Sequence, residues 1–311
     1  MEDGERRERP VVGVIGLGAM GMGAAQSAAR AGLATWGCDL RAPAVAALEA
    51  AGGRGAATPA DLAVRADVVL VYVVNAAQAR EVLFGEAGAV PAARPGTVFV
   101  LCVTMQPADA QDISERLADA GMLAIDAPVS GGSVRAMAGE IAMMAAGPPG
   151  AFDRAAPVLG AIAATVFRLG DQPGAGARMK TINQLLAGVH IAAAAEALAL
   201  AHGLGMDLAE VHRVIQSCAG NSWMFADRGA HVVAGDYAPH SAVDIFVKDL
   251  GIVTDAARAA GMPTPLSDTA LSLFRQASAA GMGRLDDAAV ALLLARQGGR
   301  PLPGDPEGGA A

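Results

Sequence analysis

The chain has 311 residues, enough for one large or two medium domains, and its apolar residues, 53% of the total, can fill a full-sized core. A formal net charge of −8 argues against nucleic acid or an anionic membrane as a partner. Gly, Arg, Asp or Glu interrupts every apolar run before the ~20 residues that a membrane span needs, and the charged start MEDGERRERP is unlike a signal peptide. We therefore expect a soluble, cytoplasmic protein.

Cysteine and histidine are sparse. The three cysteines, Cys38, Cys102 and Cys218, are scattered singly, and neither they nor the five histidines show metal-ligand spacing. We interpret the cysteines as buried small residues in a reducing compartment, and we expect no metal.

Short β-rich runs alternate with helical stretches over the first half of the chain. The expected strands are residues 11–16, 33–38, 67–74, 97–103, 122–126, 141–147 and 165–169. One helix between them has a clear start signal, with Thr58 as N-cap, Pro59 at the first helical position and Asp61 in the first turn. Such alternation predicts an α/β domain with a doubly wound parallel sheet and helices on both faces.

The pattern changes to all-helical after residues 170–176. A long, alanine-rich helix is expected at 177–204, with too little polar surface to lie exposed, so we expect it among other helices or at a subunit contact. Asp207 and Glu210 predict the start of the next helix. Further helices are expected at about 222–234, 241–261, 266–281 and 286–297. The predicted domains are therefore 1–173 (dinucleotide-binding) and 174–297 (all-helical, for substrate and dimerisation), with 298–311 a disordered Gly/Pro-rich tail.

The first strand runs directly into a glycine-rich loop, GLGAMG. Gly16, Gly18 and Gly21 have the G-x-G-x-x-G spacing, in which two glycines allow a tight turn beside a pyrophosphate and the third allows close helix packing. Asp39 ends the second β-run, 18 residues beyond Gly21, where a carboxylate accepts hydrogen bonds from the adenosine ribose and repels a 2′-phosphate. This combination predicts a Rossmann-type domain that binds NAD, and Arg41 keeps NADP as the alternative.

The segment DAPVSGG (126–132) lies between two expected strands. It is either a plain turn or an anion cradle. In a cradle, the Ser130 hydroxyl and the N–H groups of Gly131 and Gly132 would hold a carboxylate.

Lysine occurs only twice in the chain, against 21 arginines, and one of the two is Lys180 on the long apolar helix. Asn183 and Gln184 follow at i+3 and i+4, on the same helical face. The ordinary interpretation is a solvated surface charge. The functional one is a catalytic acid/base, because a buried lysine can release its proton near neutral pH whereas a guanidinium stays charged.

The second lysine, Lys248, stands among apolar residues and beside Asp249 in VDIFVKDLGIV. It is either a surface lysine or ion pair, or a second cation of the active site.

Taken together, these motifs resemble the β-hydroxyacid dehydrogenase family over about residues 11–297. The resemblance rests on GLGAMG, DAPVSGG, GARMKTINQ and KDLGIV, in the family's order. The segments INQLLAGVHIAAAAEALAL and AGNSWMFADRGAHVVAGDYAPHSAVDIFVKDLGIV look most like the L-threonate dehydrogenase branch. Two departures stand out: the family usually has asparagine where Gln184 stands, a departure that the threonate branch shares, and serine where Val103 stands.

The resemblance also implies roles for individual residues. Lys180 would be the catalytic acid/base. The substrate-binding residues would be Ser130, Gly131, Gly132, Asn183 and Gln184, and the NAD-binding residues would be Gly16, Leu17, Gly18, Ala19, Met20, Gly21, Asp39, Val74, Asn75, Thr104 and Lys248. A homodimer or homotetramer is implied as well.

The expected activity is NAD-dependent oxidation of the 2-hydroxyl of L-threonate, a small sugar acid, to the 2-keto acid. Two alternatives stay open. One is a related activity, such as tartronate semialdehyde reductase or 3-hydroxyisobutyrate dehydrogenase, and the other is a catalytically silent NAD(H)-binding module.

Overall fold

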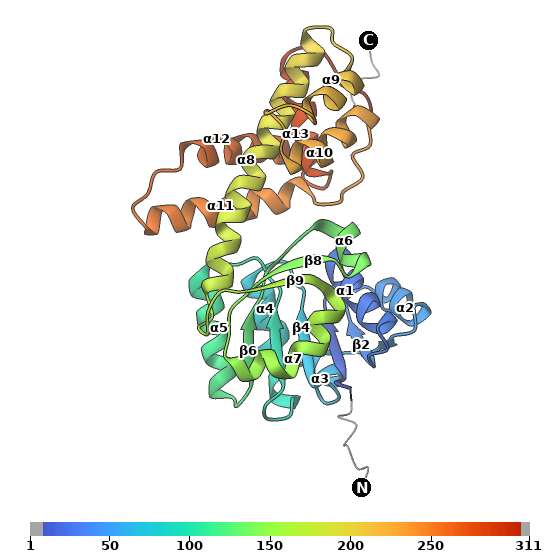
Figure 1. The fold of residues 1–311 in the computed structure, drawn as a ribbon, viewed down its shortest axis with the longest axis vertical. Coiled ribbons are helices and arrows are strands. Elements are labelled where there is room, and N and C mark those ends of the chain that lie inside the picture. Colours follow the sequence, from blue (N-terminus) through green and yellow to red (C-terminus); the bar gives the residue numbers. More distant parts are fainter. Residues whose placement is uncertain (1–8, 306–311) are drawn as a thin grey trace. The chain divides into compact units, whose positions relative to one another are not determined.

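The computed structural model describes residues 9–305, and the chain divides into two compact units between Lys180 and Thr181. The first unit is α/β and the second is all-helical, as the sequence predicts (Figure 1). The division lies within the long helix α8 (Ala175–Gly203), a few residues beyond the predicted domain boundary at 173/174. Because one continuous helix belongs to both units, that boundary stays a prediction.

Six short strands form the main sheet of the first unit, all parallel, in the order β3-β2-β1-β4-β5-β6. They are β1 (Val12–Ile15), β2 (Thr35–Cys38), β3 (Arg54–Gly55), β4 (Val68–Val71), β5 (Val98–Leu101) and β6 (Leu123–Asp126). Successive side chains point to opposite faces: Val68 and Leu70 pack on one side, and Val69 and Val71 on the other. Both faces are apolar, as in sheets covered by helices on each side.

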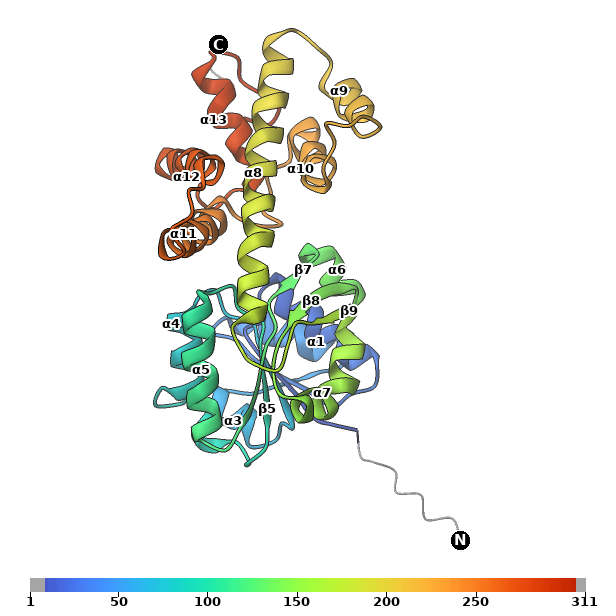
Figure 2. The same cartoon turned by 60° about the vertical axis from the view of Figure 1, so that its left-hand side comes forward.

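Helices cover both faces of this sheet (Figure 2). The helices on one face are α1 (Ala19–Arg30) and α7 (Pro149–Ile162), and on the other α3 (Pro59–Ala63), α4 (Ala76–Phe84) and α5 (Pro107–Asp119). Two further segments, α2 (Ala42–Ala50) and the 3-10 turn Val90–Ala92, complete this part of the unit. The predicted helix start at Thr58 is confirmed, since its hydroxyl accepts the Asp61 N–H at 3.0 Å.

A second, three-stranded sheet takes the last strands of the unit. It has the order β7-β8-β9, formed by β7 (Val129–Ser130), β8 (Ile141–Ala145) and β9 (Ala163–Arg168), with β7 antiparallel to β8. Helix α6 (Gly132–Ala138) connects β7 to β8. The strands expected at 141–147 and 165–169 therefore exist but lie outside the main sheet. The sequence also missed β3 and β7, since two residues are too few to show an alternating pattern.

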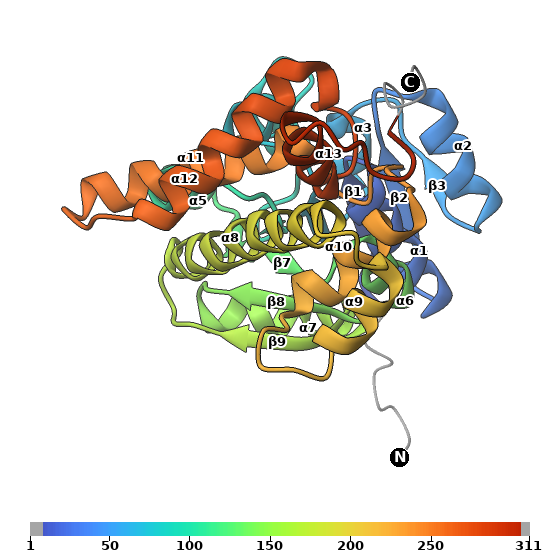
Figure 3. The same cartoon turned by 90° about the horizontal axis from the view of Figure 1, so that it is seen from above.

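The second unit consists of helices around its own core. After α8 come α9 (Leu208–Ile215), α10 (Trp223–Ala234), α11 (Val243–Ala259), α12 (Pro265–Ala277) and α13 (Val290–Gln297), with a π turn at Ser278–Met282 and a 3-10 turn at Asp287–Ala289. The predicted cap of α9 is confirmed, because Asp207 accepts the Glu210 N–H. Helices α11 and α12 lie side by side (Figure 3). The rings of Phe246 and Phe274 between them are stacked at 5.2 Å between centroids.

Helix α8 is long and apolar enough, by length and composition alone, to cross a membrane, with a mean hydropathy of 1.6 in its most apolar window. Its Ile191 and Leu198 are buried in the core of the helical unit. A Cβ added to Gly188 would lie 2.8 Å from the Leu250 side chain, so α8 and α11 approach closely there. These contacts are typical of the core helix of a globular domain, which passes the same test of length and composition.

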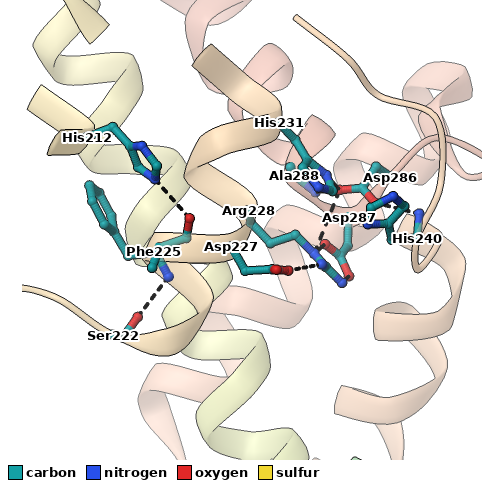
Figure 4. A network of polar contacts seen from close by, with 11 residues as sticks. His212, Ser222, Phe225, Asp227, Arg228, His231, His240, Asp286, Asp287 and Ala288 are labelled. Atoms are coloured by element: carbon teal, nitrogen blue, oxygen red, sulfur yellow. Dashed lines mark hydrogen bonds and ion pairs between the residues drawn. The ribbon is translucent and has the colours of Figure 1, made fainter. Parts of the chain in front are cut away.

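A buried ion network joins α10 to the 3-10 turn (Figure 4). The Arg228 guanidinium pairs with Asp287, Nε to Oδ1 at 2.5 Å, and His231 Nδ1 lies 3.0 Å from Asp286 Oδ1. Asp286 also accepts the His240 N–H at 2.9 Å. Both carboxylates are fully buried. Burial raises the pKa of Asp287 to about 6, although the neighbouring Arg228 opposes the shift.

Two predictions about this unit are wrong. The tail expected to be disordered from residue 298 is anchored at two points, since Leu302 is buried in the core and Asp305 pairs with Arg296, while residues 298–301, 303 and 304 are exposed. Residues 306–311, also predicted to be disordered, lie outside the described residues. Cys218, expected to be buried, is exposed, whereas Cys38 and Cys102 are buried as predicted.

Candidate active site

The predicted cofactor residues of the first unit gather at one edge of the main sheet. Each lies in the loop that follows the carboxyl end of a strand or in the first turn of the helix after it, and the register aligns the ends of β1, β2, β4 and β5. These residues are Gly16 to Gly21 after β1, Asp39 after β2, Val74 and Asn75 after β4, and Thr104 after β5. Chain order reverses between β1 and β4, and dinucleotides bind at such a switch point in open α/β sheets.

The three glycines of the β1–α1 loop are each required for a different reason. Gly16 has a φ of +90°, which a residue with a side chain rarely adopts. A Cβ on Gly21 would lie 1.9 Å from the Gly16 carbonyl oxygen, so only glycine lets α1 approach β1. A Cβ on Gly18 would meet no atom within 4 Å in the described part of the chain, and Gly18 is the N-cap of α1. The loop therefore turns tightly, packs closely and leaves open space before the helix N-terminus.

A cleft of about 640 Å³ opens at this loop. It is lined by Leu17, Gly18, Ala19, Met22, Arg41, Pro43 and Ala44. Its position beside the N–H groups of the first turn of α1 suits a pyrophosphate, because those groups carry partial positive charge. The residues present thus fit a dinucleotide. Of the predicted loop residues, Ala19 is exposed and Met20 is half-buried against the core.

Asp39 is held firmly at the edge of this cleft. Its Oδ2 accepts the Leu17 N–H at 2.7 Å, and its Oδ1 accepts the Arg41 N–H at 2.9 Å and faces Arg41 Nε at 3.1 Å. Burial would raise the pKa of Asp39, but these hydrogen bonds from Arg41 and Leu17 outweigh it and hold the pKa below its usual range. The side chain is therefore an anion at neutral pH, as recognition of a ribose diol requires.

The loop after β4 is fixed by a helix cap. Asn75 is the N-cap of α4 and its Oδ1 accepts the Gln78 N–H, while Gln78 Oε1 accepts the Val74 N–H, both at 2.9 Å. The side-chain oxygen of Asn75 therefore has a structural role as a helix cap. The Val74 side chain is 47% exposed. Thr104 is half-buried in the next loop, between β5 and α5.

Lys180 lies close to the predicted anion cradle. The ammonium of this buried residue, which is 8% exposed, donates to the Val129 carbonyl oxygen at 2.7 Å, one residue before Ser130. Gly131 and Gly132 have φ values of +135° and +71°, so the backbone after Ser130 requires glycine. The structure thus brings together two predicted features that lie about fifty positions apart in sequence.

The remaining predicted residues form a chain of polar contacts in the helical unit. Asn183 Nδ2 donates to Gln184 Oε1 at 2.8 Å, and Gln184 Nε2 donates to Asp249 Oδ2 at 2.5 Å. The other oxygen of Asp249 accepts from Lys248 Nζ. Lys248 is therefore ion-paired with Asp249, and its role as a second cation of the active site stays a prediction.

Two family models match most of the chain. Residues 11–170 match the NAD binding domain of 6-phosphogluconate dehydrogenase, and residues 174–294 match the NAD-binding domain of NADP-dependent 3-hydroxyisobutyrate dehydrogenase. An L-threonate dehydrogenase of Escherichia coli K12 is 53% identical over 294 residues, covering 94% of this chain and 96% of the relative. One of Cupriavidus necator is 52% identical over 95% of this chain and 99% of its own length. The crystal structure of a 3-hydroxyisobutyrate dehydrogenase from Salmonella typhimurium is similar at a TM-score of 0.87 and 52% identity, covering 91% of this chain and 99% of that one.

The chain belongs to the β-hydroxyacid dehydrogenase family. It is accordingly an oxidoreductase with an NAD-binding domain, and the predicted fold class is confirmed. The relatives are dehydrogenases of different substrates, L-threonate and 3-hydroxyisobutyrate, and one of the two matching families is NADP-dependent. Within this family, the carboxylate of Asp39 at the cleft favours NAD.

Two residues of this β-hydroxyacid dehydrogenase were not predicted as part of the site. Asp126 Oδ2 accepts the N–H groups of Gly174 and Ala177 at 2.8 and 2.9 Å, at the N-terminus of α8, which carries Lys180. Asp126 Oδ1 has no hydrogen-bond partner among residues 9–305. Burial raises the pKa of Asp126 to about 6, against these backbone hydrogen bonds. Asp249 is the other residue. Both stand in motifs that the sequence singled out, but their contacts lie about fifty or more positions away.

Proposed function

We propose that the chain oxidises the 2-hydroxyl of L-threonate to the 2-keto acid, 2-dehydro-L-erythronate, with NAD as the oxidant. The observation that carries the chemistry is the buried ammonium of Lys180, held 2.7 Å from the Val129 carbonyl beside Ser130. The L-threonate dehydrogenases at 50–53% identity support the choice of substrate.

In the proposed reaction, the C2–H bond of the substrate breaks as a hydride and the O2–H bond breaks as a proton. NAD, when bound, supplies the hydride acceptor at C4 of its nicotinamide. The unprotonated amine of Lys180 takes the hydroxyl proton on Nζ, and returns it in the reverse reaction.

Other residues bind and orient. The Ser130 hydroxyl and the N–H groups of Gly131 and Gly132 hold the substrate carboxylate, and Asn183 and Gln184 serve its hydroxyl groups. The loop Gly16–Gly21 holds the pyrophosphate of NAD, and Asp39 holds the adenosine ribose. In this proposal Val74, Asn75, Thr104 and Lys248 complete the cofactor site, with residues 1–173 as the cofactor domain and 174–297 as the substrate and dimerisation domain.

Substitution of Lys180 tests the mechanism. In Lys180→Ala we expect turnover to fall by ~10²–10⁴-fold, the usual loss when a general acid/base is removed. Lys180→Arg serves as the matched control for charge, since it keeps a cation that cannot release its proton, and it should be equally inactive. NAD affinity, measured by calorimetry, should stay near the wild-type value in both. An active Lys180→Arg enzyme would contradict the role of Lys180.

The substrate is tested by NADH formation with L-threonate, D-threonate, D-erythronate, 3-hydroxyisobutyrate and glycerate, each with NAD and with NADP. We expect L-threonate with NAD to give the highest kcat/KM. A preference for 3-hydroxyisobutyrate, the substrate in the name of the Salmonella relative, or for glycerate would overturn the substrate but leave the role of Lys180 standing. NAD binding without turnover of any acid would indicate a silent NAD(H)-binding module.

We also propose that the enzyme is a cytoplasmic homodimer or homotetramer. Ile182, Leu186 and Leu200 lie on one face of α8 and are exposed at 56%, 49% and 62%. A second copy of the chain would remove this apolar face from water. Light scattering should give a mass of at least two chains, and Leu186→Glu should lower it. A wild-type monomer would contradict the proposal.

A further inference from the structure

Asn183, Gln184 and Asp249 form a continuous row of hydrogen bonds within the helical unit, which we call the amide relay. Asn183 Nδ2 donates to Gln184 Oε1, and Gln184 Nε2 donates to Asp249 Oδ2. Gln184 is 7% exposed and Asp249 is 2% exposed, whereas Asn183 is half-buried. The relay therefore begins at a buried carboxylate and ends at a side chain that a ligand can reach.

The direction of the relay follows from the chemistry of its buried end. A carboxylate accepts hydrogen bonds and donates none, and Asp249 is held as the partner of the Lys248 ammonium. Gln184 must therefore turn its NH₂ toward Asp249 and its carbonyl oxygen toward Asn183. Asn183 in turn must present its NH₂ to Gln184. Each amide has two chemically different ends, so fixing the first fixes the second.

We propose that Asp249 and Gln184 are positioning residues that hold Asn183 with its Oδ1 turned toward the substrate, as an acceptor for a hydroxyl group. The enzyme would thereby select acids that carry a hydroxyl on the carbon next to the reacting carbon over acids that lack one there. This inference rests on the proposed function, in which Asn183 contacts the substrate. Without the relay, the side-chain amide of Asn183 can rotate and present either its Oδ1 or its NH₂ to the substrate.

Gln184→Met tests the relay, because it keeps the length of the side chain and removes both hydrogen bonds. L-threonate is compared with 2-hydroxybutyrate, an acid of the same chain length that lacks the outer hydroxyls. We expect the ratio of their kcat/KM values to fall by about 10–100-fold, through KM for L-threonate, as a lost hydrogen bond in a buried site implies. Gln276→Met, an exposed glutamine of α12 in the same unit, is the matched control and should leave the ratio unchanged.

A double variant tests the direction. Gln184→Glu alone places two carboxylates in contact and should lower the ratio. Combined with Asp249→Asn it keeps the total charge, and the new carboxylate again accepts the N–H of Asn183 while the new amide donates to it. We expect this pair to recover most of the wild-type ratio, which a merely structural role for Gln184 would not produce.

Three outcomes separate the possibilities. Equal losses with both substrates in Gln184→Met, or no recovery in a double variant whose thermal midpoint matches the wild type, would overturn the relay. A wild-type enzyme that prefers 2-hydroxybutyrate would overturn the selection for hydroxyl groups. A wild type that oxidises neither acid but turns over 3-hydroxyisobutyrate overturns the proposed function and, with it, the inference.

Discussion

The two units build their polar sites by different means. In the first unit the candidate cofactor site is largely backbone: Gly16 turns the chain, Gly21 lets α1 approach, and Gly18 leaves space beside the helix N-terminus. In the helical unit the polar sites are networks of side chains, the amide relay and the ion network of Arg228. A backbone site fails when an atom is added to it, whereas a side-chain network fails when a partner is removed.

The two networks of the helical unit differ in turn. The ion network consists of full charges, because Arg228 faces the fully buried carboxylates of Asp286 and Asp287 and also pairs with the partly exposed Asp227 (Figure 4). The amide relay has an open end at the half-buried Asn183. Buried charges that pair with one another stabilise the fold, whereas the amide of Asn183 leaves a polar group for a ligand. The comparison predicts that substitutions in the first should change stability, and in the second selectivity.

The largest expected effect is on stability, in Arg228→Met. Removing the guanidinium leaves the buried Asp287 carboxylate without its ion-pair partner, which costs about 3–5 kcal/mol of the free energy of unfolding. Urea unfolding should show this loss, while the folded fraction keeps its kcat. The control is Arg213→Met, at an exposed arginine of α9, which should stay within about 0.5 kcal/mol of wild type. A stable but inactive Arg228→Met enzyme would place this network in the active site. It would contradict the assignment of the ion network to stability.

The glycines of the first unit provide the converse test, in which an atom is added. The methyl group of Gly21→Ala would meet the Gly16 carbonyl oxygen, so the backbone must shift at a cost of about 1–3 kcal/mol, and NAD binding should be lost. Gly18→Ala is the matched control for the fold, because its methyl group enters open space. It should keep the wild-type stability but bind NAD about tenfold more weakly, a cost of ~1.4 kcal/mol. Equal stability of the two variants would contradict this account of the loop.

The same contrast explains what the sequence could predict. The glycine loop was predictable because its spacing encodes backbone geometry, and the caps at Thr58 and Asp207 were predictable because they act three residues away. Asp126 and Asp249 were missed, since a carboxylate that bonds a distant segment leaves no local pattern. The long helix α8 was found almost to its ends from its apolar composition.

Short or irregular segments were the other source of error. The strands β3 and β7 are two residues each, and the separate sheet depends on how β7 pairs with β8. Residues 298–305 read as a tail because Gly and Pro dominate them, yet one leucine, Leu302, and the ion pair of Asp305 hold them to the core. Amino-acid composition indicates whether a segment tends to be ordered by itself. It does not show whether the rest of the fold offers that segment a surface to pack against.

Asp126 combines the backbone and side-chain kinds of site, because its buried carboxylate accepts the backbone N–H groups of Gly174 and Ala177. Its pKa is raised from its ordinary value of 3.8 to about 6 in the folded chain, so between these values the folded state binds more protons than the unfolded state. Its contribution to stability is therefore fully present below about pH 4 and is lost as the pH rises through about 6, roughly 1.4 kcal/mol for each unit of pKa difference. In Asp126→Asn, the free energy of unfolding should therefore change less with pH between about 4 and 6. An unchanged pH dependence of urea unfolding would contradict the shift.

Asp39 gives the most specific effect, because it is the side chain that adds cofactor choice to a backbone site. In Asp39→Ser we expect NAD to bind about 10–100-fold more weakly, as the loss of charge-assisted hydrogen bonds of about 1.5–3 kcal/mol implies. NADP should gain relative to NAD, since the repelling carboxylate is gone and the Arg41 guanidinium, no longer paired with it, can face a 2′-phosphate. The ratio of kcat/KM for the two cofactors measures this. Adding Arg41→Met should remove the gain in NADP but not restore NAD, and a ratio unmoved by Asp39→Ser would mean that the backbone of the cleft selects the cofactor by itself.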